Sequence, residues 1–231
     1  MKTLGIIGGI APDSTIEYYR LITASYHAQE SDGNYPSLII NSINLKKMIE
    51  LITANRLADL TEYLLAEVRR LAQAGADFAL LASNTPHIVF DEIQRQSPLP
   101  LLSIVESACE AARGLELKRV GLFGTRFTMR GQFYPEVFSR QGIKIIVPEP
   151  EDQEYIHDKY MSEFINGIFL PETREGLLGI VERLKETTGI EGLILGGTEL
   201  PLILRDVSDR GIPFLDTTRI HAEAAVARML S

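Results

Sequence analysis

The chain of 231 residues is poor in the residue types that define several protein classes. It has one cysteine, Cys109, so no internal disulfide can form and no cysteine cluster can hold zinc. Its 23 Lys and Arg are outnumbered by 31 Asp and Glu, which disfavours nucleic acid and anionic membranes as partners. Its apolar runs, such as residues 78–82, are far shorter than the roughly 18 residues of a membrane span. Because the apolar start of the chain is too short for a signal peptide, we expect a cytoplasmic protein.

Short apolar runs, many of them β-branched, alternate with longer amphipathic stretches along the whole chain. Strands that lack polar alternation and are joined by helices are typical of a parallel α/β sheet covered on both faces. The predicted strands are residues 3–7, 37–41, 78–82, 99–103, 119–123, 144–147, 192–195 and 213–215. The predicted helices are residues 14–29, 58–75, 86–96, 104–114, 131–141, 152–169, 171–188 and 218–230.

Three segments of the chain recur in the same order at a nearly constant offset. Residues 2–9 resemble residues 118–125, residues 75–85 resemble residues 189–199, and residues 100–112 resemble residues 213–225. A repeat of this length is a domain and not a solenoid unit. The sequence therefore predicts two pseudo-symmetric α/β halves, residues 1–113 together with a C-terminal helix at 216–231, and residues 114–215.

Small or hydroxyl-bearing residues follow the equivalent predicted strands of the two halves. Ligands of parallel α/β sheets bind beyond the carboxyl ends of the strands. Ser83 and Gly197 occupy equivalent positions there, so two facing halves would present them to opposite sides of one ligand. That arrangement suits removal of a proton from one face of a carbon atom and its return on the other face.

The glycine pair Gly8–Gly9 raises the alternative of a dinucleotide site. Its fingerprint needs a second glycine where Ile10 stands, and an acidic residue after the second strand, where this chain has Asn44. We therefore disfavour NAD. These glycines either permit a tight strand-to-helix turn or contact a ligand directly, and both alternatives stay open.

The segments at the strand ends resemble those of the aspartate/glutamate racemase family. Ser83-Asn84-Thr85-Pro86-His87 resembles the family's Cys-Asn-Thr-x-His, and residues 121–129 resemble its Gly-Thr-x-x-Thr-Met segment. Residues 196–199, Gly-Gly-Thr-Glu, resemble its Gly-Cys-Thr-Glu. The resemblance implies two Rossmann-like halves, a homodimer, and racemisation of a small dicarboxylic amino acid such as aspartate or glutamate. It also implies that neither a cofactor nor a metal takes part, because two cysteines flank the substrate's α-carbon and transfer its proton.

Both cysteine positions of the family lack sulfur in this chain, where Ser83 and Gly197 stand. A serine hydroxyl is a far weaker base than a thiolate, and glycine has no side chain. The catalytic candidates are therefore these two positions together with Glu199 and His87, which could transfer the proton in place of the thiols. The alternatives are a buried structural role for His87 and, as the resemblance implies, a supporting role for Glu199.

Donor groups near the strand ends, together with the resemblance, give the candidates for substrate binding: Gly9, Ile10, Asn84, Thr85, Thr125, Thr128, Thr198 and Lys47. Asn84 and Thr85 suit a carboxylate, although both residue types also cap helices. Lys47 could pair with the distal carboxylate of the substrate, and Arg126 and Arg130 are alternatives. A plain solvated charge is the competing interpretation of each cation.

Three functions follow from these observations. The chain could be an amino-acid isomerase of the racemase type, a related enzyme with changed proton-transfer chemistry, or a non-catalytic protein that binds small carboxylates. The resemblance favours the first, and the replaced cysteines favour the second. Retention of Asn84, Thr85, Thr198 and Glu199 speaks against complete loss of the site.

Overall fold

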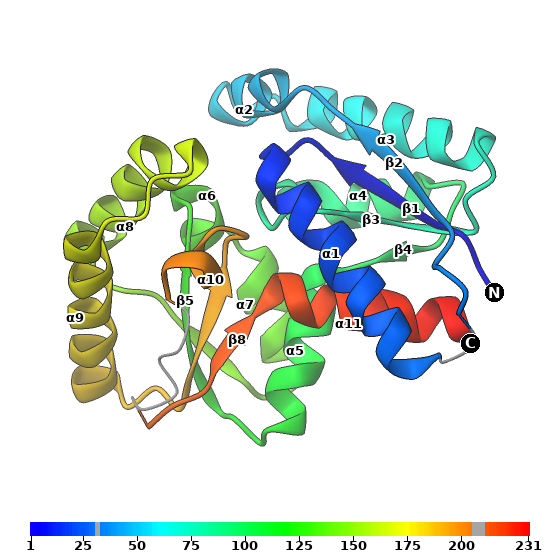
Figure 1. Cartoon of the computed structure of the whole chain (residues 1–231). Coiled ribbons are helices and arrows are strands. Elements are labelled where there is room, and N and C mark those ends of the chain that lie inside the picture. Colours follow the sequence, from blue (N-terminus) through cyan, green and yellow to red (C-terminus); the bar gives the residue numbers. More distant parts are fainter. Residues whose placement is uncertain (31–32, 205–210) are drawn as a thin grey trace. The chain divides into compact units, whose positions relative to one another are not determined.

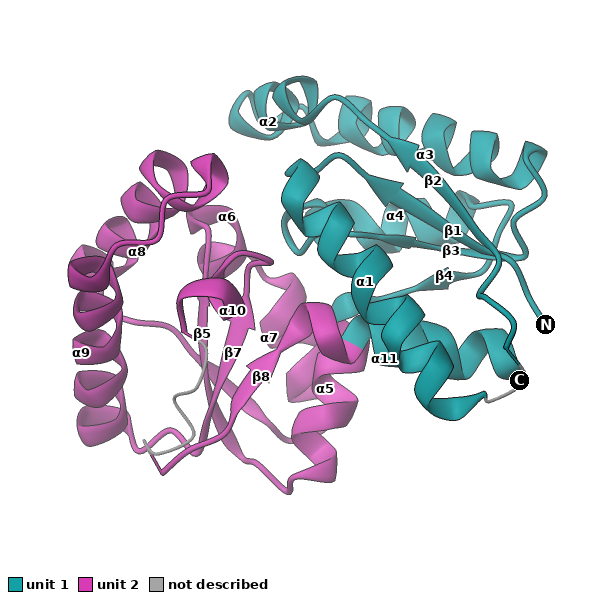
Figure 2. Ribbon diagram, in the orientation of Figure 1, with its two compact units in different colours: residues 1–104, 221–231 teal, residues 105–220 magenta. Residues whose placement is uncertain are grey.

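The computed structural model describes residues 1–30, 33–204 and 211–231, and the contacts divide the chain into two compact units (Figure 1 and Figure 2). Unit 1 comprises Met1–Ile104 and His221–Ser231, and unit 2 comprises Val105–Ile220. The chain crosses between the units within α5 (Ile104–Gly114) and again within α11 (Thr217–Leu230). In the described part of the chain, no helix is both long enough and apolar enough to span a membrane.

Unit 1 is built on a parallel sheet of four strands in the order β2-β1-β3-β4. The strands are β1 (Leu4–Gly8), β2 (Leu38–Ser42), β3 (Phe78–Leu81) and β4 (Leu101–Leu102). The helices are α1 (Pro12–Gln29), α2 (Leu45–Thr53), α3 (Leu57–Gln73), the 3-10 helix η1 (Thr85–Val89), α4 (Phe90–Gln96) and the later part of α11.

Successive residues of β1 point alternately toward two layers of helices. Leu4 and Ile6 are fully buried in one cluster with α1 and α11, which includes Tyr18 and Val226. Gly5 lies between them and faces α3, where a side chain would come within 3.0–3.2 Å of Leu71. Burying a side chain such as Leu4 contributes about 1.5–3 kcal/mol, so both layers hold the sheet through apolar packing.

Unit 2 repeats this architecture, with a parallel sheet in the order β6-β5-β7-β8. The strands are β5 (Arg119–Gly124), β6 (Lys144–Ile146), β7 (Gly192–Gly196) and β8 (Phe214–Asp216). The helices are α6 (Arg126–Arg130), α7 (Phe133–Ser139), α8 (Pro150–Ser162), η2 (Phe164–Asn166), α9 (Pro171–Thr188) and α10 (Leu200–Ile203), together with α5 and the start of α11. The core combines β5 and β7 with α8 and α9, as in the buried cluster of Phe123, Leu193, Ile156 and Val181.

The matching strand orders confirm the predicted fold class of two α/β halves with parallel sheets. The register is equivalent as well, because Ile6 pairs with Leu80 in unit 1 and Leu122 with Ile194 in unit 2. Ser83 and Gly197 accordingly follow equivalent strands, β3 and β7. The sheet of each unit thus carries one of the two positions at the same topological place.

The helices differ from the prediction mainly in their ends and in the shortest elements. α1 begins at Pro12 and not at residue 14, because proline is well suited to the first turn of a helix. The predicted helix 152–169 separates into α8 and η2, and Gly167 then adopts a left-handed conformation with φ of 71°. The prediction omits α2, α6 and α10, of which α6 has 5 residues and α10 has 4, too few to show a helical period.

Candidate active site

The first candidate cluster follows β3 in unit 1. Ser83 and Asn84 leave the strand and lead directly into η1, which begins at Thr85. All three residues are buried, with exposed fractions of 9% for Ser83, 2% for Asn84 and 7% for Thr85. The Asn84 side chain does not cap η1, which weakens the helix-capping alternative for this residue. Polar groups are thus gathered at this strand end in a largely water-excluded setting.

His87 belongs to the same cluster, and the chain binds both of its ring nitrogens. Nδ1 lies 3.0 Å from the carbonyl oxygen of Ser83, and Nε2 accepts the backbone N–H of Ile104 at 3.3 Å. The ring also stacks on Phe90 with 4.7 Å between centroids. Burial, together with the nearby His221, lowers the pKa of His87 to about 3, although hydrogen bonds to the neighbouring backbone act in the opposite direction. This geometry favours a neutral structural histidine that ties η1 to the start of α5.

The turn after β1 carries Gly9 and Ile10. Gly9 has φ of 75°, and a side chain there would lie 2.5–2.8 Å from Ser42 and from the backbone of Ile43. Its N–H donates to Thr15 Oγ1 at 2.9 Å, while the Ile10 carbonyl accepts the Ser14 hydroxyl at 3.1 Å. The structure therefore supplies the conformational reason for glycine at this tight turn. Ligand contact by either residue stays a prediction.

The proposed cation of unit 1, Lys47, lies in the first turn of α2. Its backbone N–H donates to the Asn44 side chain at 3.2 Å, which caps the helix. Its Nζ lies 4.2 Å from the centre of the Tyr63 ring, a cation–π contact. The ammonium group thus lies over an aromatic face.

The second candidate cluster follows β7 in unit 2, in the segment Gly197-Thr198-Glu199 before α10. A side chain at Gly197 would meet Tyr160 of α8, at 2.5 Å from Cε2 and 2.6 Å from the hydroxyl oxygen. Real side chains do not approach so closely, so the tyrosine ring occupies the space that a larger residue 197 would need. The sequence motif leaves out this residue, which reaches the strand end from a different helix.

Glu199 joins the segment to the tyrosine through hydrogen bonds. Its Oε2 accepts the Tyr160 hydroxyl and, at 2.9 Å, the Thr198 hydroxyl. All three residues are at most 5% exposed. Burial, reinforced by the neighbouring carboxylate of Glu199, raises the pKa of Tyr160 well above its usual value of 10. The arrangement is therefore a neutral phenol that donates to a buried acidic side chain.

The turn between β5 and α6 holds the remaining candidates of unit 2. Thr125 caps α6 by accepting the N–H of Thr128 at 3.4 Å, and the two hydroxyls lie 3.3 Å apart. Thr128 is fully buried. Arg126 and Arg130 both form ion pairs with Glu154, at 2.9 and 2.7 Å. To bind either guanidinium, a substrate carboxylate would have to displace Glu154 or share the guanidinium with it.

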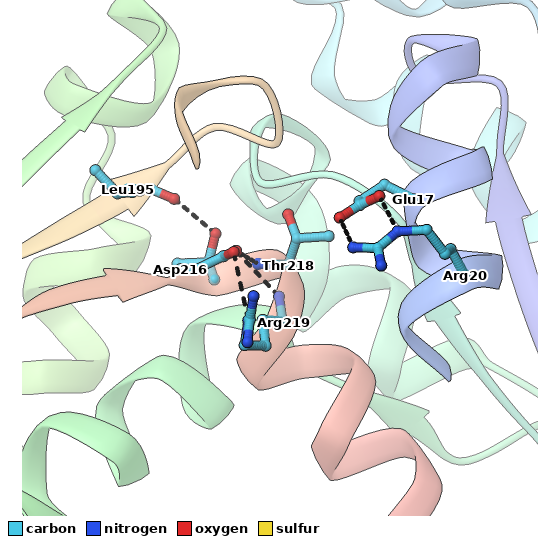
Figure 3. A network of polar contacts seen from close by, with 7 residues as sticks. Glu17, Arg20, Leu195, Asp216, Thr218 and Arg219 are labelled. Atoms are coloured by element: carbon cyan, nitrogen blue, oxygen red, sulfur yellow. Dashed lines mark hydrogen bonds and ion pairs between the residues drawn. The ribbon is translucent and has the colours of Figure 1, made fainter. Parts of the chain in front are cut away.

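Asp216, at the end of β8, organises the start of α11. Its Oδ1 accepts the backbone N–H groups of Thr218 and Arg219, both at 3.0 Å (Figure 3). In the same figure, Glu17 and Arg20 of α1 form a surface ion pair at 2.6 Å, which contributes little stability. The carboxylate of Asp216 therefore serves as a helix cap.

Each unit thus brings its own predicted residues together at one strand end: Ser83, Asn84, Thr85 and His87 in unit 1, and Gly197, Thr198 and Glu199 in unit 2. Lys47 lies in the first turn of α2, which follows the neighbouring strand β2. Tyr160 is a residue to which the sequence analysis assigns no role at this strand end. The absence of a side chain at position 197 is a hint of it in the sequence, because a close-packed interior fills such a space with another group. Among residues 1–30, 33–204 and 211–231, no three His, Cys, Asp or Glu side chains are grouped to hold a metal ion.

A family model of the Asp/Glu/hydantoin racemases matches residues 7–225 of the chain. The chain belongs to this family. Among solved structures, an Asp/Glu racemase candidate from Yersinia pestis has a TM-score of 0.91 and 32% identity, with 100% of both chains covered. An aspartate racemase homologue from Pyrococcus horikoshii OT3 has a TM-score of 0.86 and 32% identity, again over 100% of both chains.

Sequence relatives of this family member include named racemases, which are isomerases. Glutamate racemase of Aquifex aeolicus (strain VF5) is 28% identical over 166 residues, which cover 67% of this chain and 59% of that protein. The chain therefore matches less than two thirds of that relative's length. The broad specificity amino-acid racemase RacX of Bacillus subtilis (strain 168) is 24% identical over 242 residues, covering 99% of this chain and 98% of that protein.

Proposed function

We propose that the protein is an amino-acid isomerase that removes and returns the α-proton of a small acidic amino acid such as aspartate or glutamate. The observation that carries the proposal is the equivalence of Ser83 and Gly197, which follow matching strands of two equally ordered sheets. Two equivalent sites suit a reaction that treats two mirror-image substrates alike. Membership of the racemase family supports the same reaction class.

The substrate is proposed from the buried donors at the strand ends and from the names of the relatives. Asn84 and Thr85 in unit 1 and Thr198 in unit 2 offer amide and hydroxyl groups suited to a carboxylate. Relatives are named for glutamate, for aspartate and for broad specificity, so a panel of amino acids is needed. We further propose a cytoplasmic homodimer that needs neither a metal nor an organic cofactor.

The replaced cysteines support a change in the groups that move the proton. Ser83 and Gly197 offer no thiol, and the described contacts of His87 engage both of its ring nitrogens. The reaction then depends on other acid–base groups of the two clusters. Glu199 is the acidic side chain that lies directly beside position 197.

Exchange of the α-hydrogen with solvent deuterium tests this function. The purified protein, dialysed against EDTA, is incubated in D₂O with L- and D-forms of aspartate, glutamate, alanine and lysine. Loss of the α-proton NMR signal and appearance of the opposite enantiomer by chiral chromatography are expected for at least one acidic amino acid. Carboxylate binding without exchange from any amino acid would contradict the proposal and favour a binding protein.

A further inference from the structure

Tyr160 occupies the position at which a side chain of residue 197 would begin. The ring atoms Cε2 and Cζ and the hydroxyl oxygen lie 2.5–2.9 Å from the place of a Cβ on Gly197. The ring is 5% exposed and packs edge-on against Phe164, with 5.7 Å between centroids. A phenol is therefore held firmly at the end of β7, where this chain has no side chain of its own.

The Tyr160 hydroxyl is also the first member of a hydrogen-bonded chain. It donates to Glu199 Oε2, which accepts the Thr198 hydroxyl as well. Glu199 Oε2 is thus within hydrogen-bond reach of the proton on the phenol. A proton given up by the phenol would therefore have an acceptor already in place.

We propose that Tyr160 and Glu199 act together as the proton-transfer group of unit 2, in place of the side chain that Gly197 lacks. This inference rests on the proposed isomerase function. In one direction, the substrate's α-proton moves to Tyr160 Oη, the phenol's own proton moves to Glu199 Oε2, and the C–H electron pair stays on the substrate. In the other direction, Glu199 returns its proton to Oη, and the phenol delivers its proton to the carbanion.

The two residues have to act in concert because neither suits the task alone. Burial raises the pKa of Tyr160 well above 10, so a free phenolate does not accumulate at neutral pH. A neutral phenol is a poor base, but one that loses its proton to Glu199 as it gains another never becomes a free phenolate. Glu199 supplies the proton affinity, and Tyr160 supplies the oxygen at the position beside Gly197.

The same argument makes the two strand ends unequal. Unit 1 offers the Ser83 hydroxyl and His87 at its strand end. Both ring nitrogens of His87 are engaged, because Nδ1 contacts the Ser83 carbonyl oxygen and Nε2 accepts the Ile104 N–H. We therefore expect α-hydrogen exchange of one enantiomer, with retention of its configuration, to run faster than inversion.

The test measures α-deuterium exchange and inversion for the wild-type protein, Tyr160→Phe, Glu199→Gln and the double variant. Tyr155→Phe is the matched control, because Tyr155 lies on the same helix α8 but places its hydroxyl beside Gly176 of α9. Tyr160→Phe keeps the packing of the ring, and Glu199→Gln keeps the shape of the carboxylate. Thermal unfolding of every variant shows whether the fold is retained.

Each single variant is expected to lose exchange by about 10²-fold or more. The double variant is expected to lose no more than the worse single variant, because the two residues work as one unit. Because residues in hydrogen-bond contact also couple when their role is structural, the transfer role is shown by a loss of kcat with KM and the unfolding midpoint unchanged. Exchange within threefold of wild type in folded Tyr160→Phe, or multiplicative losses in the double variant, would overturn the inference and leave the proposed function standing. A wild-type protein that exchanges no amino acid would overturn both.

Discussion

The ends of β3 and β7 are the same place in two copies of one architecture, yet they handle their polar groups differently. In unit 1, the imidazole of His87 is bound to the backbone on both sides and stays neutral. In unit 2, the phenol of Tyr160 reaches the strand end from α8 and donates to the carboxylate of Glu199. The repeat thus preserves strand order and register, while the polar contacts at each strand end depend on which distant side chain packs there.

The largest expected effect comes from restoring thiols at both strand ends. Ser83→Cys with Gly197→Cys should be hindered, because the new Cβ at position 197 would lie 2.5 Å from the Tyr160 ring. Adding Tyr160→Ala makes room, and we expect the triple variant to racemise aspartate or glutamate about 10²–10⁴-fold faster than the double variant. Chiral chromatography under initial-rate conditions measures the difference.

The Ser83→Cys variant is the control for the thiol at position 83 alone. Urea unfolding should show that the double variant, which keeps Tyr160 beside the Gly197→Cys substitution, is destabilised by about 1–3 kcal/mol through overpacking. Equal racemisation and equal stability of the double and triple variants would show that the Tyr160 ring does not occupy the site in solution.

Acid should destabilise unit 1 through two buried histidines. Burial lowers the pKa of His87 to about 3 and, despite a hydrogen bond to Leu102, that of His221 to about 4. Their unfolded value is about 6.5, so this stability is complete above pH 6.5 and is lost as the pH falls toward 4. At pH 5, each histidine lowers the free energy of unfolding by about 2 kcal/mol, because each pH unit below 6.5 removes ~1.4 kcal/mol.

Urea unfolding at pH 7.5 and pH 5, with amide hydrogen exchange resolved by segment, checks this expectation. Protection should fall first in β1, β3 and the later part of α11, which form the core around His221. A His87→Gln, His221→Gln variant should be less stable at pH 7.5 but should show a weaker pH dependence. The same pH dependence in that variant would exclude the histidines as the cause.

Alkaline pH should destabilise unit 2 instead of unit 1. Burial raises the pKa of Tyr160 and Tyr134 far above 10, so both stay neutral in the folded protein. The unfolded chain releases these protons near pH 10, and the stability is therefore present below pH 10 and lost above it. At pH 11 the loss is about 1.4 kcal/mol for each tyrosine. In Tyr134→Phe, the loss of stability between pH 9 and pH 11 should be smaller by the contribution of Tyr134, as measured by urea unfolding at both pH values. Tyr19→Phe, on the exposed face of α1, is the control.

The sequence predicts the eight strands of the described residues, the repeat and both strand-end positions, because apolar runs and recurring short segments can be recognised along the chain itself. It does not predict α6 and α10, whose few residues show no period. It also misses the contact between Tyr160 and Glu199, which joins segments far apart in the chain and depends on how α8 packs against the sheet of unit 2. Local patterns thus predict the scaffold, whereas the contact between Tyr160 and Glu199 is a property of the folded unit.

The smallest expected effect concerns Asp216, which caps α11 at the equivalent of position 103 in unit 1. Asp216→Ala removes the acceptor for the N–H groups of Thr218 and Arg219, so we expect a loss of about 1 kcal/mol in urea unfolding. Asp216→Asn keeps an acceptor oxygen and should lose less.

Because a cap acts within the first turn, amide exchange should quicken at residues 217–220, which belong to unit 2. Residues such as Val226 and Met229, buried in the core of unit 1, should exchange as in the wild type. Faster exchange along all of α11 would show instead that the helix unfolds as a single piece, and that the two units share one cooperative element.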